Sequence, residues 1–88
     1  MSNPTRNLLL RKTTLEALGF AKGYALPDAT LRSHVDALLR PPLSGEEWTI
    51  TTAWLESERL VVRVPNDLDA ALIQWAITER GRVLLSTL

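Results

Sequence analysis

Residues 54–64 read WLESERLVVRV and residues 72–82 read LIQWAITERGR, and these two stretches decide the fold. Residues 60–64 are rich in β-branched side chains, which predicts a strand. In residues 72–77 the large apolar side chains alternate with smaller or polar ones, the period-two pattern of a second strand. The segment Pro65-Asn66-Asp67 between them has turn chemistry. The two strands are therefore expected to pair as an antiparallel hairpin.

A helix is predicted immediately before this hairpin, over residues 44–59. Ser44 and Glu47 have the spacing of a capping box, in which each side chain bonds the other residue's backbone N–H. One face of the helix is expected to pack inward, and it carries Trp48, Thr51, Thr52 and Leu55. Ile50 and Trp54 lie well round the cylinder from that face. The helix is thus apolar on more than one side, which is unusual for a surface helix of a small domain.

The chain is expected to begin with a helix over residues 4–18. Asn3 is a favourable N-cap residue, because its side chain can accept from the free N–H groups of the first turn. Pro4 fits the first helical position, where its missing N–H costs nothing. Gly19 is predicted to end the helix in a left-handed conformation.

Shorter elements fill the remaining sequence. Residues 24–27 are long enough only for a minimal strand. A further helix is predicted to start with Asp28 as its cap and to end before Pro41 and Pro42, because a residue that precedes proline avoids helical geometry. After the hairpin, Thr78 is expected to cap a final short helix. That last helix carries Val83 and either Leu84 or Leu85 as apolar contacts.

The length of 88 residues suits a single domain, over residues 1–88, with a small core. The expected core consists of the apolar positions that share a face, namely Leu15, Leu18, Leu31, Val35, Leu38, Leu55, Leu60, Val62, Ile73 and Ile77. Three tryptophans exceed what such a core needs. Trp48 and Trp75 fit inside it, whereas Trp54 belongs either to the core or to an interface, where tryptophan is enriched.

The order helix, short strand, helix, helix, strand, turn, strand, helix resembles a winged helix-turn-helix domain. Residues 54–61, WLESERLV, are similar to the end of a recognition helix that runs into the wing. Residues 75–82, WAITERGR, are similar to the segment that closes the wing in the MarR, ArsR and PadR families of transcriptional regulators. The resemblance covers nearly the whole chain. Arg59 departs from it, since those families often have glycine at that position.

This resemblance implies an α+β fold, a small winged-helix domain with three helices, a two- or three-stranded β wing and a short C-terminal helix. In those families the third helix enters the DNA major groove and the wing touches the backbone or the minor groove. Double-stranded DNA is therefore an implied partner, and the protein is an expected transcriptional regulator and dimer. The implied DNA contacts are Thr49, Thr52, Arg59 and Arg63.

The charge pattern leaves an alternative open. The formal net charge is zero, whereas nucleic-acid-binding domains usually carry a basic excess. Residues 1–43 hold six basic and three acidic side chains, and residues 44–88 hold four basic and seven acidic ones. The acids of the predicted third helix and wing tip are Glu46, Glu47, Glu56, Glu58, Asp67 and Asp69. Phosphate contacts dominate DNA affinity, so this pattern favours a protein–protein interaction module that does not bind DNA.

Self-association is expected under either interpretation. A small chain with a modest core gains stability when it buries further apolar surface against a second copy. Candidate interface residues are Ile50 and Trp54 on the third helix and Leu10 and Leu85 on the terminal helices. A dimer through the third helix would block DNA, whereas a dimer through the terminal helices would leave that helix free.

Residue types that support catalysis are sparse. The sequence has no cysteine, which excludes disulfides, thiolate metal sites and thiol nucleophiles. His34 is the single histidine and has no partner at a spacing typical of metal sites or catalytic triads. We therefore expect no enzyme activity, no metal and no cofactor. Apolar runs fall well short of the roughly 18 residues that cross a bilayer, and a cytoplasmic location is expected.

Overall fold

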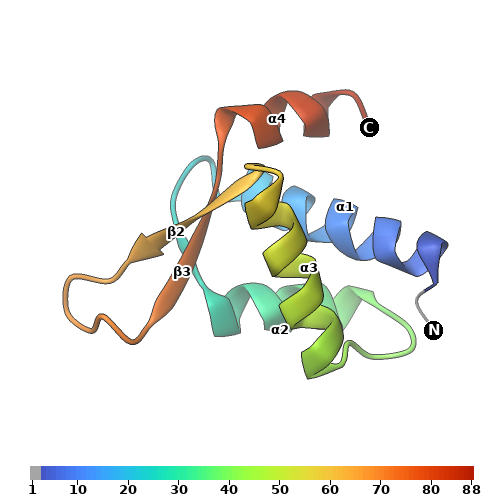
Figure 1. Cartoon of the computed structure of the whole chain (residues 1–88), viewed down its shortest axis with the longest axis horizontal. Coiled ribbons are helices and arrows are strands. Elements are labelled where there is room, and N and C mark those ends of the chain that lie inside the picture. Colours follow the sequence, from blue (N-terminus) through green and yellow to red (C-terminus); the bar gives the residue numbers. More distant parts are fainter. Residues whose placement is uncertain (1–2) are drawn as a thin grey trace.

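The computed structural model describes residues 3–88. Along the chain it has α1 (Pro4–Phe20), β1 (Leu26–Pro27), α2 (Asp28–Leu38), α3 (Gly45–Ser57), β2 (Val61–Pro65), β3 (Ile73–Ile77) and α4 (Glu79–Ser86). Figure 1 shows α3 crossing in front of α1 and α2, with α4 above them and the β2–β3 hairpin projecting to one side. The expected α+β arrangement of helices, a small antiparallel sheet and a C-terminal helix is confirmed.

The predicted hairpin forms, and a third strand joins it. The strand order is β1-β3-β2, and both pairings are antiparallel. β2 pairs with β3 from Val61 opposite Ile77 to Pro65 opposite Ile73. The Asn66 side chain accepts hydrogen bonds from two backbone N–H groups of the connecting loop, at 2.8 and 3.2 Å. This is the local turn chemistry that the sequence indicates.

Most of the expected core is buried as predicted, namely Leu15, Leu18, Leu31, Val35, Leu55, Leu60 and Ile77. Trp48 and Trp75 are buried with them. The core also contains apolar residues outside the predicted set, which are Leu10, Ala17, Leu39, Leu43 and Val61. The faces chosen for α1, α2 and α3 are thus correct in outline.

Leu38 was wrongly assigned to the core. It lies in the last turn of α2 and is 62% exposed, whereas Leu39 is 1% exposed. The helix ends at Leu38, and Leu39 has an extended backbone with φ −108° and ψ 145°. This change of direction, which helical periodicity does not anticipate, turns the second leucine into the core.

Val62 and Ile73 were also wrongly assigned to the core. Val61 faces Ile77 across the sheet and both are buried, so the alternation of a strand directs Val62 to the opposite face. Ile73 shares the face of Ile77, but it pairs with Pro65 at the far end of the hairpin. That end extends beyond the helices (Figure 1), which leaves Ile73 exposed.

Helix starts are predicted better than helix ends. Asn3 caps α1, the capping box at Ser44 is present, and the Thr78 side chain caps α4. The prediction that Gly19 ends α1 was wrong, because the helix continues through Phe20. Gly19 instead packs under α4, where an added Cβ would lie 2.7 Å from the Leu85 side chain.

Substitution of the neighbouring leucines at the end of α2 should separate core from surface. Leu39→Ala is expected to lower the free energy of unfolding by about 2–5 kcal/mol, because it opens a cavity. Leu38→Ala is the matched control and should change it by less than about 0.5 kcal/mol. Urea denaturation followed by tryptophan fluorescence measures both values. Equal losses for the two variants would contradict this assignment of the α2 end.

Candidate nucleic-acid interface

One face of α3 is free of intramolecular packing. The helix buries Trp48, Thr51, Thr52 and Leu55 against the rest of the domain. The opposite side is exposed, and we call it the outward stripe; it consists of Glu46, Thr49, Ile50, Ala53 and Ser57. A stripe of this kind, beside a hairpin wing, is the geometry with which a winged helix can enter a DNA groove.

A polar contact at the start of α2 holds α3 against the wing. Asp28 was predicted as the N-cap of α2, but it is the first helical residue, and the N-cap position belongs to Pro27. Its Oδ1 accepts from the indole Nε1 of Trp48 on α3 and from that of Trp75 on β3, each at 2.9 Å. One carboxylate therefore links three elements behind the outward stripe.

Arg6 of α1 neutralises one carboxylate of α3. Its Nη2 donates to Glu47 Oε1 at 3.0 Å, and its Nε donates to the other oxygen of the same carboxylate. The hydrogen bond from Arg6, followed by the bond from the Ser44 N–H, lowers the pKa of Glu47 to about 2. Arg6 also donates to the carbonyls of Pro41 and Pro42 in the preceding loop. Glu47 is thus turned toward α1 and away from the outward stripe.

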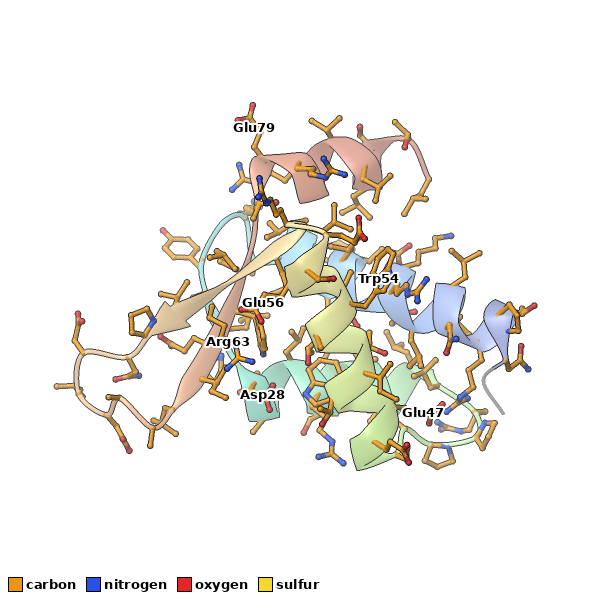
Figure 2. All side chains as sticks on the ribbon, viewed as in Figure 1. Asp28, Glu47, Trp54, Glu56, Arg63 and Glu79 are labelled. Carbon is orange, nitrogen blue, oxygen red and sulfur yellow. The ribbon has the colours of Figure 1, made fainter. Side chains whose placement is uncertain are left out.

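Arg63 of β2 pairs with a second carboxylate of α3. Its Nε lies 3.1 Å from Glu56 Oε2, and its guanidinium carbon lies 5.1 Å from the centre of the Trp75 ring. Figure 2 shows Glu56 and Arg63 meeting between α3 and the hairpin. Two of the four glutamates that make this helix acidic in the sequence are therefore paired with arginines. Glu46 is the carboxylate that the outward stripe itself carries.

Two basic side chains lie along one edge of the outward stripe, one near each end of α3. The Arg32 guanidinium, from α2, lies 3.7 Å from the position that a Cβ would occupy on Gly45 at the start of α3. Arg63, on the wing side, keeps about half of its side chain exposed. Arg59 follows the end of α3 with φ 60°, a left-handed conformation that glycine adopts more readily. A glycine at this position would adopt the same backbone with less strain.

The predicted site residues divide into exposed and buried groups. Thr49, Arg59 and Arg63 are exposed near α3 and the wing, as the DNA interpretation requires, and Ile50 lies on the outward stripe. Thr52 was predicted on the inward face of the helix and was also an implied DNA contact. It is buried, and its hydroxyl donates to the carbonyl of Trp48 at 3.1 Å, so it faces the core and not a DNA groove.

The other expected interface residues lie around the terminal helices. The prediction that Leu10 lies at an interface between two copies was wrong, because this side chain is buried in the core. Leu85 is half-buried against that core. Trp54 is also half-buried, and the Arg11 guanidinium carbon stacks 3.8 Å from the centre of its ring. Trp54 therefore contributes to both the core and the surface.

Sequence reasoning missed the position of Arg32. It belonged to an apparent scatter of six basic residues in the first half of the chain. Its place on α2, one position after the buried Leu31, marks it as exposed, but only the fold brings it to the start of α3.

An apolar groove lies on another side of α3, between the end of that helix and α4. Its volume is about 570 Å³. The apolar side chains that line it are Trp54, Leu60, Val83 and Leu84. The polar and charged side chains of its wall are Glu58, Glu79, Arg80 and Thr87. The groove and the outward stripe are separate surfaces, which matters for where a second copy could bind.

The described part of the chain, residues 3–88, holds no cluster of three or more histidines, cysteines or carboxylates that could ligate a metal. Each of its helices is too short or too polar to cross a bilayer.

Comparison with known proteins identifies the fold. No protein-family model and no curated protein matches this sequence. Among solved structures, the chain is similar to RosR of H. salinarum, with a TM-score of 0.73 and 17% sequence identity. The match covers 89% of this chain and 66% of RosR, so this chain spans less than two thirds of that protein's length. At this identity, the similarity establishes a shared fold.

Proposed function

We propose that this protein is a winged-helix DNA-binding domain of a transcriptional regulator, and a binding protein rather than an enzyme. The observation that carries the proposal is the outward stripe of α3, exposed beside a wing, with Arg32 and Arg63 along one edge. The fold similarity to RosR, itself a winged helix-turn-helix transcription regulator, supports it. A regulator of this kind acts in the cytoplasm, where it meets DNA.

The pairing of carboxylates removes part of the electrostatic objection. Glu47 and Glu56 each bind an arginine of another element, so neither presents an uncompensated charge to a DNA phosphate. In the proposed complex α3 lies in the major groove, and Arg32, near the start of the helix, contacts a phosphate along one edge of the outward stripe. Arg63 lies along the same edge near the other end; its charge is paired with Glu56, so only its remaining guanidinium N–H groups are offered to a phosphate. Arg59 and Thr49 extend this contact surface.

A protein–protein interaction module is the second candidate. The net charge of zero and the wing tip favour it. Leu68 is 98% exposed at that tip, between Asp67 and Asp69. Phosphates would repel both carboxylates, whereas an apolar and basic protein surface would accept the whole tip.

Removal of Arg32 tests the DNA proposal directly. Binding to a duplex should fall steeply with salt, because neutralised phosphates release counterions. Arg32→Ala should weaken binding and reduce the slope of log affinity against log salt by about 0.9, the contribution of one phosphate contact. Fluorescence anisotropy across a salt series measures the slope. Lys12→Ala, an exposed charge on α1, is the control and should leave it unchanged.

Two results would contradict the proposal. One is the absence of binding to any duplex at low salt, including non-specific duplex. The other is an equal effect of the Arg32 and Lys12 variants, because it would show that α3 does not set the orientation on DNA.

We also propose that the domain forms a homodimer through the groove between α3 and α4. The groove exposes contiguous apolar surface, which in soluble proteins often marks a protein–protein interface. Its wall carries both signs of charge in Glu58, Glu79 and Arg80. In a two-fold dimer the groove of one copy meets the same groove of the other copy, so acidic side chains of one wall can lie opposite the arginine of the other. This arrangement leaves the outward stripe free for DNA.

Sedimentation equilibrium at several concentrations tests the dimer. Val83→Glu places a charge at an exposed position of the groove and should shift the protein to a monomer. Val62→Glu places the same charge on the outer face of the sheet, also exposed, and should leave the dimer intact. A wild-type protein that stays monomeric at every concentration would exclude the dimer.

A further inference from the structure

The hydroxyl groups of the outward stripe are already used inside the helix. Thr49 Oγ1 donates to the carbonyl of Gly45 at 3.0 Å, and Ser57 Oγ donates to the carbonyl of Trp54 at 2.8 Å. Their protons are therefore not directed to an outside acceptor. The γ-methyl group of Thr49 is left as the apolar part of that side chain.

The rest of the outward stripe is apolar or anionic. Ile50 is 56% exposed, and Ala53 lies one turn further along the same face. None of the five stripe residues carries a guanidinium, an ammonium or a side-chain amide. These are the groups that read guanine and adenine in the major groove through bidentate hydrogen bonds.

The base edge that matches methyl groups is that of thymine. Its C5-methyl projects into the major groove and is read by apolar contact, for example with alanine or the threonine methyl. Glu46, in the first turn, can only accept hydrogen bonds while ionised, which suits the amino group of cytosine.

We propose that α3 reads thymine C5-methyl groups with Thr49, Ile50 and Ala53. This inference rests on the proposed DNA-binding function. DNA is favoured as the occupant of this apolar stripe because Arg32 supplies a guanidinium at its edge near the start of α3, and the half-exposed Arg63, paired with Glu56, supplies further N–H donors along the same edge. Recognition then comes from the thymine methyl groups at the centre of the stripe, and positioning comes from guanidinium groups along one edge.

Thymine-to-uracil substitution tests the inference, because it deletes only the methyl group. A duplex is first selected from a random-sequence pool with the full-length wild-type protein. Each thymine of the selected duplex is then replaced singly by uracil, and affinity is measured by anisotropy. At one or more positions the loss should be about fourfold, the value of one buried methyl group.

The Ile50→Ala variant ties the effect to α3. At a thymine read by Ile50, the variant should bind thymine and uracil duplexes equally. Leu8→Ala removes a leucine of similar exposure from α1 and should keep the full sensitivity to uracil. Circular dichroism of each variant confirms that it is folded.

The outcomes separate the inference from its premise. If the pool yields no bound duplex, the proposed DNA-binding function fails, and a protein partner for the stripe becomes the better explanation. If a duplex is bound tightly but no uracil substitution weakens it, the methyl readout alone is wrong. The same holds if Ile50→Ala keeps full sensitivity to uracil at every position.

Discussion

The carboxylate of Asp28 holds this small domain together at the point where its helices meet its sheet. A single oxygen accepts from the indole N–H groups of Trp48 and Trp75, which are both buried. Hydrogen bonds to an ionised acceptor contribute about 1.5–3 kcal/mol each, which is large for a domain with a small core. Over residues 3–88, every buried side-chain nitrogen and oxygen has a partner, and these two indoles find theirs in Asp28.

The geometry of the candidate interface depends on this link. Trp48 fixes which face of α3 turns inward, and Trp75 fixes β3 against the same carboxylate. Because α3 and the wing are held in a fixed relative position, Arg63 of β2 reaches Glu56. On the other side of the helix, Arg6 of α1 reaches Glu47. The outward stripe is what remains after these contacts are made. Which side chains the stripe exposes therefore depends on the hydrogen bond between Trp48 and Asp28 on the opposite side of the helix.

The sequence predicts best what local chemistry determines. The capping box at Ser44, the caps at Asn3 and Thr78, and the alternation that gives β3 depend on residues a few positions apart, and all are present. Burial at Leu38 and Leu39 depends on where α2 ends, which periodicity does not determine.

Features of the site that join distant residues were not predictable in this way. Arg6 and Glu47 are 41 positions apart, and Asp28 and Trp75 are 47 apart. Asp28 also has the local signature of an N-cap, so its role as a shared acceptor was hidden by a simpler explanation. Summing the charges of α3 made it look acidic, because the arginines that bind two of its glutamates come from α1 and β2.

Urea unfolding of Asp28→Ala is the most direct measurement of this central link. The variant leaves two indole N–H groups without their acceptor, and it is predicted to lower the free energy of unfolding by about 3 kcal/mol or more. Asp28→Asn keeps a neutral acceptor and should lose less, and Asp67→Ala, at the exposed wing tip, should lose almost nothing. A wild-type free energy of unfolding for Asp28→Ala would contradict the role given to this carboxylate.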